Sequence, residues 1–386
     1  MPYQATIFET LLKELPRRQF DQLVTRHKAD YRSRHLSSWS HLVAMVFAQL
    51  SGSQSLRDLE GGLNSQGNLL YHLGTTPVHR ATLSDANRSR RPEIFEEVFG
   101  LLLQRLQGQL RRQMKGGAEV LRLLDSTLLP LPAQRAAWAS CWRKTTGVKA
   151  HMVYDPHADV PIYYTLTKAR INDITEAKEM PLERGATYVF DRGYYDYGWW
   201  AKLTEHDCRF VTRLKKNTHV NIVETRAVID EGIKSDVIFK LNERMARSRK
   251  NPYQGLLREV VIIADNGKKL RLVSNDLHAP AQEIAALYKA RWQVELFFKW
   301  IKQNLKIKRF LGLSMNAIKI QIATALIAFM LLRLARQKAP AVLSMQALAR
   351  LIRVNLMHRK PMAMLFEPPP PRKQDPAKNN QIQWTF

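Results

Sequence analysis

The feature that most constrains the fold is a series of short apolar runs between residues 120 and 216. The segments "VLRLLDSTLLPL", "GVKAHMVYD", "VPIYYTLTKA", "ATYVFDRG" and "CRFVTRLKK" are rich in Val, Ile, Tyr, Phe and Thr, which is typical of β-strands. The first three are close enough to pair as an antiparallel meander. Helix-like segments, "ITEAKEMPLE" and "YDYGWWAKLTEH", separate the later ones, which favours parallel pairing. The sequence therefore predicts an α/β fold with the order β-β-β-α-β-α-β.

The regions on either side of this strand-rich segment have different residue patterns. Residues 1–117 show helical periodicity, as in "SWSHLVAMVFAQLSG" and "EIFEEVFGLLLQRLQGQL", and predict an all-α N-terminal domain. A second strand-rich block over 221–275 predicts a β-rich insertion before the last helices. The predicted division is thus 1–117 helical, 118–220 first part of the core, 221–275 inserted β-rich subdomain, 276–366 final helix and basic helical region, and 367–386 a Pro-rich disordered tail.

Two carboxylates lie on the predicted strands where a site can form. Asp125 is flanked by apolar residues in "RLLDSTLLP", where an acid is costly unless it is paired or metal-bound, and Asp191 ends the strand in "TYVFDRG". Their strands are expected to be neighbours, and ligands favour the carboxyl ends of such strands. The alternatives are a hydrogen-bonded core acid for Asp125 and a turn former before Gly193 for Asp191. Four other aspartates are predicted to be turn or cap residues: Asp155, Asp173, Asp196 and Asp276.

A third carboxylate lies in the helix-like segment "YKARWQVELFFKWIKQNL". At about 100° per residue, Tyr288, Arg291, Glu295 and Lys302 fall within an arc of roughly 60°, and Lys299 lies in the same arc. The helix therefore presents one polar stripe and buries the rest. The simplest alternative is a surface ion pair between Glu295 and Lys299, which contributes only about 0.3–0.5 kcal/mol.

Charge predicts the class of partner. The chain has 60 Lys and Arg against 34 Asp and Glu, a net charge of +26, and residues 296–366 carry 13 Lys and Arg but no acid. Such an excess favours a polyanion, above all nucleic acid, and an acid-free stretch repels itself unless an anion lies alongside. The apolar run Ile320 to Leu332 is too short to span a bilayer and predicts a buried helix. Two cysteines fit a reducing cytosol and are too few for a disulfide framework.

The segment from Ser53 to Arg91 is similar to a helix-turn-helix. In "RATLSDANRSRRPEIF", Ser84 or Asp85 is a candidate cap for a helix that carries Asn87 and three arginines. Short helices joined by turns also occur in any helical bundle, so the pattern leaves a purely structural role open.

Three acids beside a polyanionic substrate predict divalent metal, because unneutralised carboxylates repel phosphate. Oxygen ligands suit Mg²⁺, with Mn²⁺ as a substitute. Two such ions about 3.5–4 Å apart can activate a nucleophile and neutralise a leaving oxygen. Asp125, Asp191 and Glu295 are therefore the candidate metal ligands and catalytic residues.

The spacing of Tyr288, Arg291, Glu295 and Lys302, with "LLDST", "FDRGYYD" and "FVTRLKKN", resembles DDE transposases of bacterial insertion sequences, similar to the insertion-sequence-four family. The resemblance covers roughly residues 118–335 and implies a ribonuclease-H-like fold with a β-strand insertion. It implies that Asp125, Asp191 and Glu295 bind the metals. Phosphate contacts are implied for Tyr288, Arg291 and Lys302, and we add Lys299 and Arg192 to that set.

The resemblance also implies an activity. The protein is expected to bind the ends of its insertion sequence, to cleave and transfer DNA strands, and to act as a homodimer on double-stranded DNA in the bacterial cytoplasm, associated with the nucleoid and not with a membrane. Aromatics next to the polar stripe, Trp292 and Trp300, can stack on an unpaired base, and Trp292 is included among the candidate DNA contacts, although core packing is the more common role for both. The alternatives are a stand-alone metal-dependent nuclease and a non-catalytic DNA-binding regulator.

Overall fold

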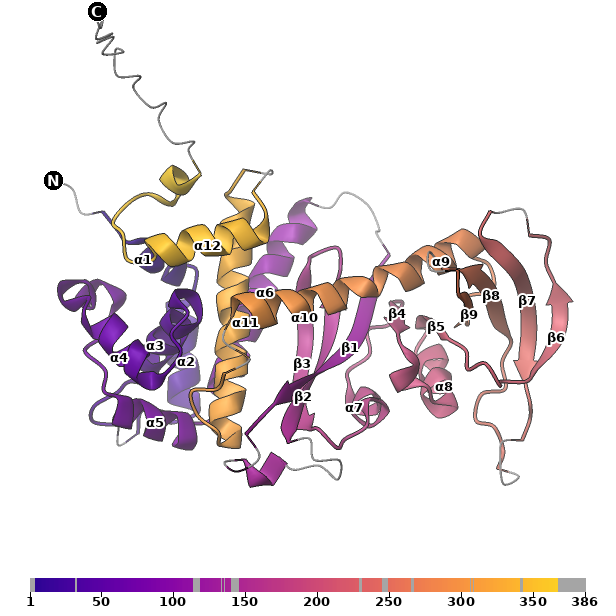
Figure 1. Cartoon of the computed structure of the whole chain (residues 1–386), viewed down its shortest axis with the longest axis horizontal. Helices are drawn as coiled ribbons and strands as arrows, with labels where there is room; N and C mark the ends of the chain where they lie inside the picture. The colour runs from indigo at the N-terminus through magenta and orange to yellow at the C-terminus, as the bar shows by residue number, and fades with distance from the viewer. Residues whose placement is uncertain are drawn as a thin grey trace, which may run out of the picture.

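The structure, a computed structural model, is a mixed α/β protein built on one nine-stranded sheet, with helices on both faces (Figure 1). It describes residues 4–31, 33–113, 119–132, 134, 136–139, 146–228, 231–244, 249–264, 267–305, 307, 309–340 and 343–366. The tail predicted to be disordered, 367–386, and Cys141 lie outside the described residues.

The N-terminal region is helical, as predicted. Its α-helices are α1 (Ile7–Leu12), α2 (Arg17–Arg26), α3 (Ser38–Ser51), α4 (Leu56–Asn64), α5 (Arg80–Ser89) and α6 (Glu93–Gln113), with two short 3-10 helices, η1 (Gly67–Leu69) and η2 (Tyr71–Leu73), between α4 and α5. Local sequence sets these boundaries. The Ser37 hydroxyl caps α3 by accepting from the Ser40 N–H, and α3 stops at Gly52, whose φ of 82° suits glycine.

The sheet has the predicted order of elements. Strands β1 (Leu121–Pro130), β2 (Gly147–Asp155) and β3 (Val160–Lys168) form an antiparallel meander, and β4 (Thr187–Phe190) and β5 (Arg209–Arg213) continue parallel to β1. Helices α7 (Asp173–Glu179) and α8 (Tyr197–Glu205) connect these strands, together with two 3-10 helices, η3 (Ala137–Ala139) and η4 (Arg192–Tyr194). The prediction that the strands of Asp125 and Asp191 are neighbours is confirmed, because β1 and β4 pair directly.

The second strand-rich block extends the same sheet. Strands β6 (Val220–Thr225), β7 (Ile233–Leu241), β8 (Leu257–Ile263) and β9 (Lys269–Ser274) are antiparallel, and β9 returns to pair with β5. The full order is β3-β2-β1-β4-β5-β9-β8-β7-β6. The chain therefore leaves the edge of the core at β5, adds four strands and comes back to that edge before the last helices.

The final helices are α9 (Ala281–Ala290), α10 (Trp292–Asn304), α11 (Met315–Gln337) and α12 (Met345–Asn355), followed by the 3-10 helix η6 (Met362–Leu365). Of these helices, α9 and α10 run along the sheet, while α11 and α12 pack against the N-terminal helices. The segment predicted as one helix is divided at Arg291 into α9 and α10. Arg291 keeps helical angles, φ −51° and ψ −31°, so the two helices follow one another along nearly the same line (Figure 1).

Two apolar cores fill the two faces of the sheet. Alternation along β1 sends Leu123 into a core shared with α10, α11 and the N-terminal helices, and Leu124 into a second core with the tryptophans of α8. The long helix α11 passes between α3 and α6 (Figure 1). Within the described residues α11 alone has the length and hydropathy of a membrane span, yet 89% of its apolar window is buried inside the protein. It is a core helix, as its sequence predicted.

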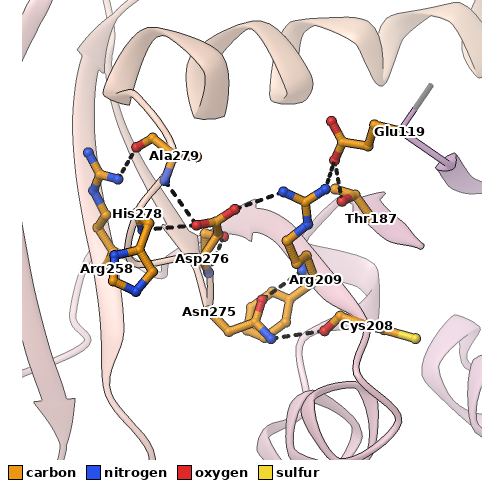
Figure 2. Close-up of polar contacts among 11 residues, drawn as sticks. Glu119, Thr187, Cys208, Arg209, Arg258, Asn275, Asp276, His278 and Ala279 are labelled. Carbon is orange, nitrogen blue, oxygen red and sulfur yellow. Dashed lines mark hydrogen bonds and ion pairs between the residues drawn. The ribbon is translucent and has the colours of Figure 1, made fainter. Parts of the chain in front are cut away.

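A polar junction fixes the start of α9. Figure 2 shows the Arg209 guanidinium between two carboxylates, 2.6 Å from Glu119 and 3.0 Å from Asp276. Asp276 also accepts the His278 and Ala279 N–H groups, so it forms the predicted turn. The junction ties β1, β5 and the turn before α9 together, and through α9 it orients α10.

Candidate active site

The register of β1 and β4 places two carboxylates side by side. Leu124 lies opposite Phe190 in the parallel ladder, so the next residue on each strand, Asp125 and Asp191, stands at the same level of the sheet. Each carboxylate is held by a main-chain donor. Asp125 Oδ1 accepts the Ser126 N–H at 2.8 Å, and Asp191 Oδ1 accepts the Gly193 N–H at 2.7 Å.

Glu295 reaches these acids from α10, which packs across β1. Its Oε1 lies 2.5 Å from Arg291 Nη2, so the i,i+4 partner of Glu295 is Arg291, and not Lys299 as in the alternative interpretation. Burial by itself lowers the pKa of Arg291, but the Tyr288 phenol and the carboxylates of Glu295 and Asp125 outweigh it and raise that pKa. The structure thus brings the three acids of the sequence prediction into one electrostatic cluster with Arg291.

The surroundings of Asp125 disfavour its charged form. Burial is the largest cause that raises its pKa to about 7, and the neighbouring Asp191 and Glu295 raise it further, while the Ser126 N–H and Arg291 oppose them. Arg291 therefore offsets only part of the cost of burying this carboxylate beside two other acids. That condition and the all-oxygen donor set fit a hard divalent cation. In the part of the chain that the structure describes, no three His, Cys, Asp or Glu side chains are yet close enough to form a complete metal site.

The remaining predicted residues surround this cluster. Tyr288 is buried beneath Arg291, whose guanidinium lies 5.7 Å from the ring centroid. Lys302 Nζ donates to Thr127 Oγ1 at 2.5 Å and to the Leu128 carbonyl at 3.3 Å, so it holds α10 against β1. Both are thus engaged with the protein itself in the absence of DNA. Two further predicted cations are exposed: Lys299 and Arg192.

The two tryptophans of α10 behave differently. Trp300 packs edge to face on Phe329 of α11 at 5.3 Å, so core packing is confirmed for this residue. For Trp292 that expectation is wrong, because 56% of its surface is exposed, one turn before the neighbouring Leu296, which is 49% exposed. An exposed aromatic therefore lies beside Arg291 and Glu295 on α10.

Sequence reasoning missed one acid close to the cluster. Asp173 was predicted to be a turn or cap residue, but its carboxylate accepts the Ser126 hydroxyl at 2.7 Å and pairs with Lys149 at 3.1 Å. The other three aspartates are confirmed: Asp155 and Asp276 close turns and Asp196 caps α8. The available signal was the position of Asp173 at the start of a helix that follows two paired strands.

The predicted DNA-reading helix also needs correction. Helix α5 begins at Arg80, so Ser84 and Asp85 lie inside it and do not cap it. Asn87 is buried and hydrogen-bonds His41 at 2.8 Å, and the Arg90 guanidinium binds main-chain carbonyls near Ser37. These two side chains support the helical packing. Six polar or charged side chains between residues 80 and 91 remain exposed: Arg80, Ser84, Asp85, Arg88, Ser89 and Arg91.

Comparisons with known proteins agree with this geometry. The family model "Transposase DDE domain" matches residues 116–331, and the model "Domain of unknown function (DUF4372)" matches residues 3–76. Among the relatives, a putative transposase (y4zB) of Sinorhizobium fredii is 39% identical over 289 residues, which cover 75% of this chain and 80% of the relative.

Two further relatives are more distant. A probable transposase for the insertion sequence element IS5377 of Geobacillus stearothermophilus is 29% identical over 67% of this chain and 68% of its own. A putative transposase for the element IS4SA of a Synechocystis strain is 27% identical over 85% and 87%. A piggyBac transposase synaptic complex with hairpin DNA matches 95% of this chain and 81% of its own, with a TM-score of only 0.41 and 14% identity. The acid cluster lies inside the matched family segment, and the chain belongs to the DDE transposase family of bacterial insertion sequences.

Proposed function

We propose that Asp125, Asp191 and Glu295 are the catalytic acids with which this DNA transposase cleaves and joins strands at the ends of its insertion sequence. The observation that carries the proposal is the β1–β4 register, which sets Asp125 beside Asp191 while α10 brings Glu295 to the same cluster. The three residues come from segments more than 50 residues apart: parallel pairing of β1 and β4 brings the two aspartates together, and α10 supplies Glu295.

The same acids are proposed to bind Mg²⁺, or Mn²⁺ in its place. When bound, two such ions activate the attacking oxygen and neutralise the leaving oxygen of a phosphodiester. The protein contributes orientation: the Ser126 and Gly193 N–H groups fix one oxygen of each aspartate and leave the other for the cation. Arg291 holds Glu295 in the free protein and can exchange this contact for a DNA phosphate, to which its guanidinium can bind through two donors.

The cations around the cluster are proposed to position DNA. Lys302, Lys299 and Arg192 join Arg291 and Tyr288 as contacts to phosphates near the cleaved end. Support comes from their place on α10 and η4, next to the acids, and from the net charge of +26. Trp292 is exposed and lies about one turn of α10 from Glu295. It is proposed to stack on a base that is unpaired from the DNA duplex at the cleaved end.

The finer architecture is proposed as well. Strands β1 to β5 with α7 and α8 correspond to a ribonuclease-H-like core, β6 to β9 to its inserted subdomain, and residues 1–117 to a DNA-binding domain. Two element ends must be joined together, so we propose a homodimer on double-stranded DNA, acting in the bacterial cytoplasm at the nucleoid.

The proposal is tested with labelled duplexes that carry the inverted repeats bracketing the gene. Asp125→Asn, Asp191→Asn and Glu295→Gln are each expected to lower strand nicking in Mg²⁺ by at least about 10³-fold, the scale of losing one charged group at a phosphoryl-transfer site. End binding in a gel-shift assay is expected to stay near that of the wild type, because the basic surface is intact.

A matched control separates chemistry from folding. Glu259→Gln removes a carboxylate that is paired with Arg271 on β8 and β9, away from the cluster, and is expected to keep nicking. If the nicking rate of any of the three acid variants is within tenfold of the wild-type rate, that acid does not belong to the site. Nicking without any joined product in the wild-type protein would favour the stand-alone nuclease.

A further inference from the structure

Asp173 occupies the sheet face opposite α10, directly behind the two catalytic aspartates. It begins α7, and two groups from the sheet contact its Oδ1: the Ser126 hydroxyl donates to it at 2.7 Å and Lys149 Nζ lies 3.1 Å away, while His151 Nδ1 lies 3.5 Å away without a hydrogen bond. Side chains alternate along a strand, so Asp125 faces α10 while Ser126 faces Asp173. The chain therefore has a partly buried fourth carboxylate beneath the cluster.

One connection runs from Asp173 to Asp125 through a single residue. The Ser126 hydroxyl donates to Asp173, and the N–H of the same residue donates to Asp125 Oδ1 at 2.8 Å. Fixing the Ser126 side chain therefore fixes the main-chain donor that orients Asp125. The Ser126 hydroxyl also interacts with the Tyr194 phenol, so loss of the Asp173 acceptor removes one of two contacts that anchor this residue and loosens that donor.

A second connection runs to Asp191. A Cβ atom added to Gly193 would lie 2.9 Å from Asp191 Oδ1 and 3.1 Å from Asp173 Oδ2. Both carboxylates therefore lie next to this glycine and leave no room for a side chain. The buried Tyr194 phenol lies in the same space. Its pKa is raised by burial first and then by the charges of Asp173, Asp125 and Asp191. Asp173 thus borders the turn that holds Asp191.

The charge of Asp173 is balanced by β2. Lys149 donates to Asp173 and also to the Ile171 carbonyl at 2.9 Å, which ties the chain before α7 to the sheet. The His151 imidazole is buried and its Nε2 contacts Thr167 Oγ1 at 2.8 Å, which leaves Nδ1 facing Asp173 at 3.5 Å without a hydrogen bond. These contacts leave Asp173 Oδ1 with little freedom to move.

We propose that Asp173 is a positioning residue for DNA cleavage, acting through Ser126 and the Gly193 turn to hold Asp125 and Asp191 at the separation that a divalent cation requires. The inference rests on the proposed function, because it takes Asp125 and Asp191 as the cation ligands. Residues that orient metal ligands affect metal affinity by about 10–100-fold when they are removed.

The experiment measures cation binding without turnover. Mn²⁺ is titrated into purified full-length protein and followed by electron paramagnetic resonance, and the Mg²⁺ concentration for half-maximal nicking is measured in parallel. Asp173→Ala and Ser126→Ala are each expected to raise both values by about 10–100-fold. The double variant Asp173→Ala/Ser126→Ala is expected to bind Mn²⁺ as weakly as the single variant with the lower affinity, because both changes break the same connection. Asp173→Asn keeps an oxygen acceptor for Ser126 and is expected to recover part of the loss.

Asp196→Ala is the matched control, since Asp196 also lies at a helix start and pairs with a lysine, Lys178, at 2.9 Å. It is expected to lower Tm without changing Mn²⁺ affinity. Mn²⁺ affinity within about twofold of wild type in Ser126→Ala and Asp173→Asn, or additive losses in the double variant, would overturn the proposal even if Asp173→Ala fails to fold. Full Mn²⁺ binding by Asp125→Asn would instead overturn the proposed function itself.

Discussion

Helices α10 and α11 follow one another in a stretch that is rich in Lys and Arg and has no acid after Glu295, yet they serve different ends. α10 lies across β1 and turns Arg291, Glu295 and Lys302 toward the acid cluster. α11 is buried along most of its length between α3 and α6. The two helices differ in their position relative to the sheet, and not in their charge. This position places α10 at the candidate site and α11 in the core.

The cations after α10 show the same division. Arg333 binds the Ala158 carbonyl and Asp159, and Lys338 pairs with Glu14 at 2.6 Å. Arg353 donates to two main-chain carbonyls. Carboxylates from distant parts of the chain thus neutralise Arg333 and Lys338, and main-chain carbonyls orient Arg353, in a stretch whose own sequence has no acid. Only part of the basic charge is left for DNA.

The largest effect is expected in the core of α11. Leu326 is fully buried there, and Leu326→Ala is expected to lower the free energy of unfolding by about 2–5 kcal/mol through lost contacts and a cavity. Nicking per folded molecule is expected to stay unchanged. Urea unfolding monitored by circular dichroism gives the first value, and active-site titration gives the second. A fall in specific activity at unchanged stability would give α11 a role in the site.

The next largest effect is expected in the pH dependence of stability, and it comes from Asp125, which α10 covers. The folded-state pKa of Asp125, about 7, lies above its ordinary value of 3.8, so the folded protein keeps a proton that the unfolded chain has lost. Without metal, this group's contribution to stability is therefore present below about pH 4 and is lost as pH rises to about 7, on the order of a few kcal/mol. Thermal melts in EDTA between pH 4.5 and 8 measure it.

Asp125→Asn is the reference for that measurement, because the amide does not titrate. The wild-type protein is expected to lose stability relative to this variant as pH rises, and added Mg²⁺ is expected to restore it above pH 7. Parallel pH profiles of the two proteins would show that Asp125 is not the titrating group.

A smaller effect is expected at the cations of α10. Arg291→Ala and Lys302→Ala are expected to lower strand joining by about 100-fold, the cost of misplacing a reacting group, and to lower first-strand nicking less. Lys319→Ala, on α11 near Glu96, is expected to change both steps equally and modestly. Single-turnover assays on intact and pre-nicked end DNA compare them. Equal losses of nicking and joining in the α10 variants would assign Arg291 and Lys302 a structural role.

The smallest effect is expected in the salt dependence of binding. Removing an exposed cation that contacts a phosphate reduces the slope of log K against log salt by about 0.9, so Lys299→Ala is expected to show that change. Lys338 is already paired with Glu14, and Lys338→Ala is expected to leave the slope unaltered. Fluorescence anisotropy on duplex DNA between low and moderate salt measures both. Equal slopes in the two variants would remove the distinction between the two groups of cations.

Much of the frame around the site follows from local patterns in the chain. Runs of β-branched and aromatic residues indicated the strands, and the helical segments between them indicated parallel pairing of β1, β4 and β5. Asp125 and Asp191 could therefore be predicted to stand together before any contact was known. The 3.6-residue period likewise placed Glu295 and Arg291 on one stripe of a helix.

Contacts between distant segments could not be predicted in this way. The β6–β9 block joins the main sheet through β5 because β9 finds a free edge there, and nothing in its own sequence specifies that edge. The sequence predicted Asn87 to be a surface residue of a DNA-binding helix. In the structure it is buried and hydrogen-bonds His41 of another helix. Glu295 has cations four residues away on both sides, and the fold selects Arg291.

The sequence by itself determined which residues are candidates for the chemistry, because strand and helix periods and residue types depend on neighbours in the chain. Tertiary structure decided how those residues are held. Asp173 shows this most clearly: alone it is an aspartate at a helix start, and only the pairing of β1 with β2 brings Ser126 and Lys149 to its carboxylate. The physical reason is that hydrogen bonds and burial depend on distance in space, which folding sets between residues far apart in the chain.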